Sequence, residues 1–232
     1  MTDLRLAIWD MDGTIVDSRD VIQRAMTRAF EATGLTPPPY EETRKIVGLG
    51  LHEACQILAP PDISGDRLAH LVESYRGAFR LLRAEPDFHE MLYDGALETL
   101  EELRDGGWLI GMATGKSRAG IRSLFDTHAL EHFFDTIWCA DDGPGKPNPF
   151  MVEQAMADLG VGPDASLMIG DAIHDIAMGR AAGVRTLGVS WGFGAAHELE
   201  EAGAHEVHHG FDTLRASLAD FAIKGTSGLR LP

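Results

Sequence analysis

The sequence has few cysteines, a deficit of basic residues and no long apolar run. Cys55 and Cys139 lie far apart without a Cys-x-x-Cys pair, which argues against a zinc cluster or a disulfide framework and fits a reducing cytoplasm. Lys and Arg number 20 against 36 Asp and Glu, a net charge of −16, which argues against a nucleic-acid partner. No stretch approaches the ~18 apolar residues of a membrane span, and no secretory signal is visible, so no membrane partner is expected.

What the sequence does contain is typical of an ordinary globular protein. Its 232 residues are 44% hydrophobic and 24% charged, enough for one large domain or two modest ones. The acidic excess does not exclude a small phosphorylated metabolite as partner, because such a ligand needs only a few local positive groups and a cation. A monomer and a homodimer both remain open.

One short stretch, Asp10-Met11-Asp12-Gly13-Thr14, suggests a chemical site. It follows the apolar run 6–9, which is typical of a buried strand. Positions i and i+2 of an extended chain point the same way, so Asp10 and Asp12 can address one ligand. Gly13 allows a sharp exit from the strand and exposes backbone amides to an anion. The alternative interpretation is a strand followed by a polar turn.

The chain changes character twice. Residues 17–88 show helical spacing of apolar residues and predict an all-helical unit with no strand. From Asp94, helices alternate with short apolar strands predicted at 108–113, 136–139, 167–169 and 186–189, and the end from Lys224 is expected to be loose. This alternation predicts an α/β fold, a Rossmann-like parallel-sheet core with helices on both faces. Residues 1–16 and 89–232 would form this core, and 17–88 an inserted all-α cap.

Chemically capable side chains stand at or just beyond four predicted strand ends. They are Asp10 with Asp12, Thr114, Lys146, and Asp171 with Asp175. Loops after parallel strands gather at one sheet edge, where ligands bind. Phosphoryl transfer needs a nucleophile, an acid/base, a cation and donors for the phosphate oxygens. The sequence offers each of them.

The residue types suggest particular roles. Asp10 is the candidate nucleophile, and Asp12 is the candidate acid and base. Asp171 adds a carboxylate for Mg²⁺, a cation that prefers oxygen ligands. Thr114 can donate a hydrogen bond to a phosphate oxygen, and Lys146 can supply positive charge.

Simpler interpretations remain open for single residues. Thr114 by itself reads as a helix-cap or turn threonine, and Lys146 by itself as a surface lysine. Asp175 suits either a place beside the metal or the first turn of a helix, where the dipole favours an acid.

The chain resembles the haloacid dehalogenase superfamily of phosphohydrolases. The stretch at 10–14 matches the first family motif and Ala113-Thr114-Gly115 the second. Gly145-Lys146-Pro147 matches the third, and residues 170–175 match the fourth. The resemblance implies that Thr114, Gly115 and Lys146 bind the substrate. It also implies that Asp10, the backbone carbonyl of Asp12, and Asp171 hold Mg²⁺, with Asp175 supporting the metal shell or orienting Lys146.

The helical insertion resembles the small α-helical cap of the subfamily that contains phosphoglycolate phosphatase. This resemblance implies a Mg²⁺-dependent phosphatase acting on a small, phosphoglycolate-like phosphomonoester through an aspartyl phosphate. The dehalogenase branch of the superfamily lacks the second aspartate of the first motif. This chain has it as Asp12, which favours phosphoryl transfer. A sugar phosphomutase of the β-phosphoglucomutase type and a catalytically silent binding module are the alternatives.

Two features of the cap remain without an assigned role. Arg44 and Lys45 form either a positive patch on the substrate side or a solvated helix end. The segment Val47 to Gly50 resembles the cap loop that faces the site in phosphoglycolate phosphatase relatives.

Overall fold

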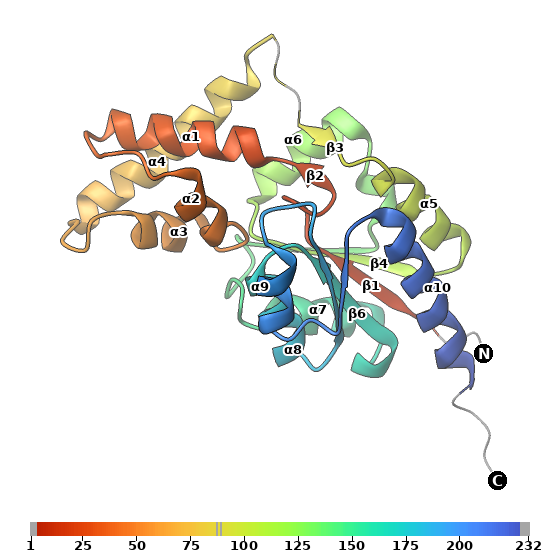
Figure 1. The fold of residues 1–232 in the computed structure, drawn as a ribbon. Coiled ribbons are helices and arrows are strands. Elements are labelled where there is room, and N and C mark those ends of the chain that lie inside the picture. The colour runs from red at the N-terminus through yellow and green to blue at the C-terminus, as the bar shows by residue number, and fades with distance from the viewer. Residues whose placement is uncertain (1–3, 87, 89, 228–232) are drawn as a thin grey trace.

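The computed structural model describes residues 4–86, 88 and 90–227. Its centre is a six-stranded parallel sheet in the order β5-β4-β1-β6-β7-β8 (Figure 1). The strands are β1 (Leu6–Trp9), β4 (Leu109–Thr114), β5 (Thr136–Cys139), β6 (Ser166–Gly170), β7 (Arg185–Val189) and β8 (Glu206–His208). The predicted α/β fold class is therefore confirmed.

Helices bury both faces of this sheet, which explains why β1 is apolar throughout. Ala7 and Trp9 point into one core cluster, and Leu6 and Ile8 point into another on the opposite face. The first face is covered by α5 (Ala96–Asp105), α6 (Arg118–His128) and α10 (Phe211–Ser227). The second is covered by α7 (Phe150–Leu159) and α8 (Ile173–Ala181), while α9 (Ala196–Glu201) follows β7. Short 3-10 helices span Glu131–Phe133 and Pro163–Ala165.

The strand order places β1 at the middle of the candidate site. From β1 the chain proceeds to β4 and β5 on one side, then returns to β6 on the other side of β1. Ligands of open α/β sheets bind at such a reversal, beyond the carboxyl ends of the strands. The loops after β1, β4 and β6 therefore meet at one place.

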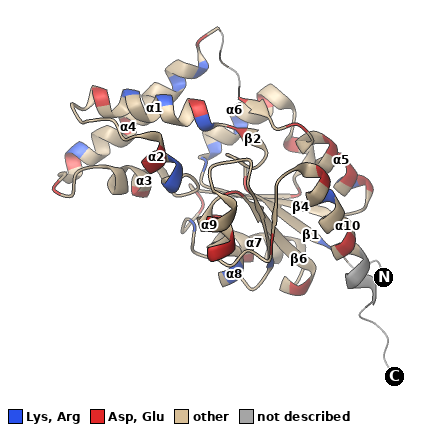
Figure 2. Ribbon diagram, in the orientation of Figure 1, with Lys and Arg blue, Asp and Glu red and all other residues tan. Residues whose placement is uncertain are grey.

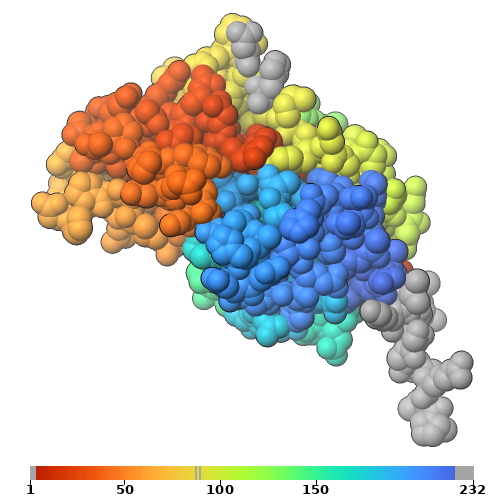
Figure 3. All heavy atoms as spheres, viewed as in Figure 1, coloured from red at the N-terminus to blue at the C-terminus, as the bar shows by residue number. Residues whose placement is uncertain are grey.

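Four helices between β1 and β4 form a unit with its own core above this edge. They are α1 (Arg19–Ala32), α2 (Tyr40–Ile46), α3 (Leu51–Leu58) and α4 (Gly65–Arg83). Their buried apolar side chains form one cluster, which Phe193 of the loop after β7 joins from the sheet side. Figure 3 shows this unit, in red and orange, resting directly on the blue C-terminal part of the core. We call it the cap.

The structure corrects two details of the expected organisation. Strand β2 (Val16–Asp17) pairs antiparallel with β3 (Met91–Leu92), so Asp17 is not part of a purely helical segment. A strand of two residues is too short to show periodicity, and only pairing across the insertion reveals it. Helix α10 also continues to Ser227, past the point where a loose end was expected, and residues 228–232 lie outside the described part.

The excess of Asp and Glu over Lys and Arg is spread over the whole molecule and does not form one acidic patch in the view of Figure 2. Figure 2 shows Asp and Glu on helices of both the cap and the core, including α3, α5 and α9. Within the described ranges, none of the helices combines the length and the apolar character that crossing a membrane requires.

Candidate active site

Asp10 and Asp12 follow β1 at the carboxyl edge of the sheet. The Asp10 backbone N–H donates to the Ile169 carbonyl of β6 at 2.9 Å, which fixes the chain there. Asp10 is 2% exposed, the Asp12 side chain is 13% exposed, and both line one cavity. The structure thus brings the two carboxylates together, while their chemical roles remain predictions.

A tight turn separates the two aspartates from the cap. The Met11 carbonyl accepts hydrogen bonds from the N–H groups of Ile15 and Val16, both at 3.0 Å. Gly13 has a φ of +87°, and a Cβ there would overlap the carboxylate of Asp171. Only glycine suits this position, because any other residue would be strained and would displace Asp171.

Lys146 lies between two carboxylates. Its Nζ is 2.5 Å from Asp10 Oδ1 and 2.6 Å from Asp175 Oδ1, and its side chain is fully buried. Burial disfavours the ammonium, but the two carboxylates outweigh it and raise the pKa of Lys146 above its ordinary value. The surface-lysine interpretation is therefore wrong. Lys146 is not among the cavity-lining residues. It therefore influences the cavity through Asp10, which lines the cavity and contacts Lys146.

Asp171 is held from two sides at the end of β6. Its Oδ1 accepts a hydrogen bond from Thr14 Oγ1 at 2.8 Å, and its Oδ2 accepts one from the Phe193 N–H at 2.7 Å. Asp171 is completely buried, so these contacts leave its carboxylate in one orientation. A Cβ on Gly192 would overlap this carboxylate, so the loop after β7 also depends on glycine.

The side chains of Asp10, Asp171 and Asp175 fit a divalent cation. One oxygen of each lies within 4.8 Å of the other two, and all three are buried. Burial raises the pKa of Asp10 to about 7, despite the opposing effect of Lys146, and burial next to Asp175 and Asp10 raises the pKa of Asp171 well above its ordinary value. Three buried carboxylates face one buried lysine, so a cation would compensate their charge. An all-oxygen donor set suits Mg²⁺.

The end of β4 contributes Thr114 and Gly115 to the cavity lining. Thr114 is fully buried, and its Oγ1 accepts a hydrogen bond from the Lys116 N–H at 3.2 Å. The hydroxyl thus shapes the turn, and Thr114 lines the cavity. A Cβ on Gly115 would overlap the Gly48 carbonyl of the cap, so glycine is what permits the cap loop to approach the sheet here.

Lys116 is a site residue to which the sequence assigned no role. Its Nζ lies 2.7 Å from Asp12 Oδ1 and 3.4 Å from Glu90 Oε1, with only 7% of the side chain exposed. Burial lowers the pKa of Lys116, but Asp12 and Glu90 outweigh it and raise that pKa overall. Glu90 in turn lies 3.2 Å from Arg83 of α4. The only signal in the sequence was a lysine two positions after a strand end.

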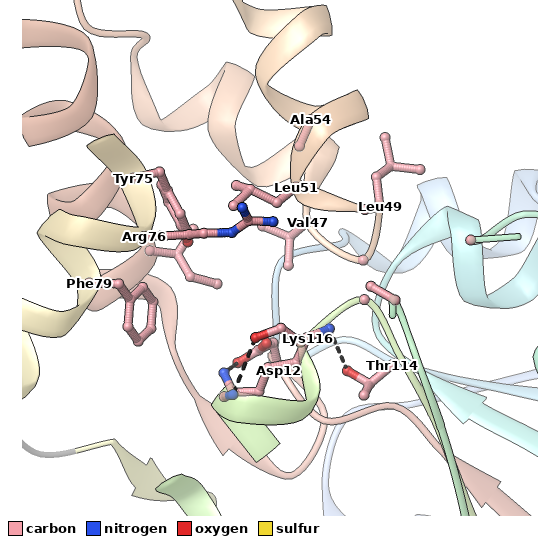
Figure 4. A pocket seen from close by; sticks show the side chains of 18 of the residues that line it. Asp12, Val47, Leu49, Leu51, Ala54, Tyr75, Arg76, Phe79, Thr114 and Lys116 are labelled. Atoms are coloured by element: carbon pink, nitrogen blue, oxygen red, sulfur yellow. Dashed lines mark hydrogen bonds and ion pairs between the residues drawn. The ribbon is translucent and has the colours of Figure 1, made fainter. Parts of the chain in front are cut away.

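A cavity of about 690 Å³ separates the cap from the core (Figure 4). The core side of its lining includes Asp10, Asp12, Thr114 and Lys116. The cap side is supplied by α1, by the loop from Val47 to Gly50 with the start of α3, and by α4. The expectation that the 47–50 loop faces the site is therefore confirmed.

Arg44 does not belong to this cavity. Its guanidinium binds Glu198 of α9 through two contacts of 2.8 and 3.0 Å and donates to the Phe193 carbonyl at 3.2 Å. Lys45 is exposed and does not line the cavity either. The positive-patch interpretation is wrong for both residues, because Arg44 joins cap and core while Lys45 is a solvated helix end.

Comparison with known proteins agrees with this geometry. The model of the haloacid dehalogenase-like hydrolase family matches residues 7–189. The probable phosphatase IndB of Dickeya dadantii is 33% identical over 202 residues, covering 85% of this chain and 86% of that protein. The pyrophosphatase PpaX of Bacillus velezensis is 29% identical over 202 residues, covering 86% and 90%. The chain belongs to the haloacid dehalogenase-like hydrolase family.

Solved structures show the same architecture. A hydrolase from Pseudomonas syringae superposes with a TM-score of 0.82 at 26% identity, covering 93% of this chain and 98% of that one. A predicted phosphatase from Clostridium acetobutylicum gives 0.82 at 24% identity, covering 94% and 99%. The first comparison supports kinship, and the second supports the fold. The family resemblance seen in the four motifs is confirmed.

Proposed function

We propose that this protein is a Mg²⁺-dependent phosphatase that hydrolyses a small phosphomonoester through an aspartyl phosphate on Asp10. The observation that carries the proposal is the position of Asp10. Its carboxylate lies on the cavity floor, is bound by Lys146, and stands within reach of Asp171 and Asp175. Asp12 lines the same cavity.

The reaction would proceed in two displacements at phosphorus. In the first, a carboxylate oxygen of Asp10 forms a bond to phosphorus, and the bond from phosphorus to the ester oxygen breaks. Asp12 gives its proton to that oxygen, and the alcohol leaves. In the second, Asp12 takes a proton from a water molecule that attacks the same phosphorus. The bond to Asp10 breaks, inorganic phosphate leaves, and both side chains return to their starting states.

Mg²⁺ would be held by Asp10, the backbone carbonyl of Asp12, and Asp171. When bound, it supplies the positive charge that lets a dianionic phosphate approach buried carboxylates. Asp175 orients Lys146 through their 2.6 Å contact, and Lys146 offsets negative charge at Asp10. Thr114 and Gly115 border the cavity where phosphate oxygens would need hydrogen-bond donors.

Phosphoglycolate is the first substrate suggested by the family resemblance, and pyrophosphate is suggested by the name of the PpaX relatives. Both cysteines are buried and free, which suits the reducing cytoplasm that we propose as its location.

Phosphate release tests the proposal. Wild type and Asp10→Asn would be assayed on a panel of phosphomonoesters and on pyrophosphate, with Mg²⁺ and with a chelator. We expect release that requires Mg²⁺ and that Asp10→Asn abolishes. An isomerised sugar phosphate in place of free phosphate would indicate a mutase. No turnover of any compound would indicate a binding module and would refute the proposed hydrolysis.

A further inference from the structure

The two sides of the cavity differ in chemistry. The core side is polar, with Asp12, Thr114, Lys116, Ser117 and Asp141 in its lining. The cap side contributes apolar side chains, Ile22, Met26, Val47, Leu49, Leu51 and Phe79 among them, and also His52, Glu53, Arg76, Arg80 and Arg83. A phosphomonoester bound with its phosphate at Asp10 must place its leaving group against the cap. The apolar wall therefore faces the leaving group and not the phosphate.

The size of the cavity sets a second constraint. At about 690 Å³ it lies within the range of roughly 300–1,000 Å³ that is typical of sites for drug-sized ligands. A two-carbon acid such as glycolate would fill a small part of that space and would leave the apolar wall in contact with water. A bulky apolar group would displace this water and gain the free energy of burial.

Helix α4 adds three arginines to this lining, of which Arg83 is paired with the buried Glu90. Figure 4 shows the guanidinium of Arg76 extending from α4 into the cavity, close to Leu51 and Val47 and across from Asp12 and Lys116. Its ion pair is with Glu73 on the same helix, and the Glu73 side chain is 61% exposed. An exposed pair of this kind contributes little, so the guanidinium can exchange it for a ligand at small cost.

We propose that the substrate is a phosphomonoester with a bulky, mostly apolar leaving group that carries an anionic substituent, which Arg76 binds. This inference rests on the proposed phosphatase activity, and it replaces phosphoglycolate with a larger ester as the expected substrate. Leu51 and Arg76 become the residues that determine specificity, one through apolar contact and one through charge. Sugars and two-carbon acids become poor substrates, because neither covers the apolar wall.

The test compares primary alkyl phosphates, so that differences in leaving-group acidity stay small. The set is ethyl phosphate, phosphoglycolate, glucose 6-phosphate, benzyl phosphate and 4-carboxybenzyl phosphate, each assayed with Mg²⁺ for kcat/KM. We expect 4-carboxybenzyl phosphate to be used best, with benzyl phosphate second. Higher kcat/KM for phosphoglycolate or glucose 6-phosphate would overturn the inference and leave the phosphatase proposal intact. If none of the five esters is hydrolysed, the phosphatase proposal itself is contradicted.

Two variants test whether Leu51 and Arg76 cause the preference for the benzyl and carboxybenzyl esters. Leu51→Asn should lower kcat/KM for benzyl phosphate about tenfold but change ethyl phosphate less than about twofold, because only the larger group contacts this wall. Leu81→Asn is the matched control, since Leu81 lies on α4 with 67% exposure and outside the cavity lining. Arg76→Met should remove the advantage of the carboxylated ester, a loss of about tenfold, because a charge-assisted hydrogen bond disappears.

Equal effects of Leu51→Asn and Leu81→Asn would overturn the assignment of the apolar wall. An unchanged preference for 4-carboxybenzyl phosphate in Arg76→Met would overturn the assignment of Arg76. Thermal unfolding of each variant shows whether the fold is retained.

Discussion

Lys116 Nζ lies 2.7 Å from Asp12 Oδ1, and this contact connects the candidate acid/base to the cap. Lys116 also contacts Glu90, and Glu90 contacts Arg83 near the end of helix α4. Charges alternate along this row, and the Lys116 and Glu90 side chains are at most 7% exposed. The orientation of the Asp12 carboxylate therefore depends on Lys116 of the core, on Glu90 in the segment that leads from the cap back to the core, and on Arg83 of the cap.

Loss of this contact should affect proton transfer more than binding. We expect Lys116→Met to lower kcat/KM about tenfold or more for an alkyl phosphate, because a misplaced Asp12 protonates the leaving oxygen poorly. The loss should be smaller for p-nitrophenyl phosphate, whose leaving group needs no proton. The measurement is kcat/KM for both esters, because this constant reports the steps up to departure of the leaving group. Lys45→Met is the control, since Lys45 is exposed and outside the cavity lining. Equal losses for both esters would show that Lys116 has only a structural role.

The ion pair between Arg44 and Glu198 should make stability depend on pH in the acidic range. Hydrogen bonds from Arg44 and from the Ala195 N–H lower the pKa of Glu198 from 4.5 to about 2. A carboxylate with a lowered pKa stabilises the folded state above its unfolded pKa. This contribution is lost as the pH falls from about 4.5 towards 2. The pair is partly solvated, so we expect at most about 1 kcal/mol.

The corresponding experiment compares thermal unfolding of wild type and Glu198→Gln. The wild type should unfold about 2–4 °C higher at pH 7, and the difference should shrink as the pH is lowered through this range. Glu42→Gln is the control, since Glu42 is exposed on the same cap helix as Arg44. A difference that stays constant with pH would contradict the ion-pair explanation.

Gly115 should be sensitive to a single methyl group. A Cβ there would overlap the Gly48 carbonyl, so Gly115→Ala must push the cap loop away from the sheet. We expect kcat/KM to fall about tenfold or more, because small displacements of a site are costly. Gly65→Ala at the start of α4 meets no atom within 4 Å and should leave activity unchanged. Wild-type kcat/KM in Gly115→Ala would mean that this close approach is not needed for turnover.

The sequence predicted most of the fold because its strongest signals are local. The strand Leu6–Trp9 is an apolar run bounded by polar residues, and the strand predicted at 136–139 has those bounds in the structure. The two-residue strands β2 and β3 could not be predicted, because they are too short to show an alternating pattern and pair residues about 75 positions apart.

The residues of the candidate site also fall into those that the sequence predicts and those that only the structure reveals. Asp10, Thr114 and Asp171 could be found because each stands at the end of an apolar strand, and parallel strands bring those ends together. Lys116 and Glu90 could not, because their importance comes from distances of a few ångströms between segments far apart in the chain. Arg44 was misread for the same reason, since its partner Glu198 is supplied by a distant helix.

The central claim is that Asp10 carries the phosphoryl group, and trapping that intermediate tests it most directly. The protein would be mixed with Mg²⁺ and p-nitrophenyl phosphate, whose leaving group needs no proton from Asp12, quenched in acid within one turnover, digested and analysed by mass spectrometry. We expect a phosphoryl adduct on the peptide that contains Asp10, more of it in Asp12→Asn, where the activating base is missing. Asp10→Asn should form none. Rapid phosphate release without any adduct, or an adduct on another residue, would contradict the account.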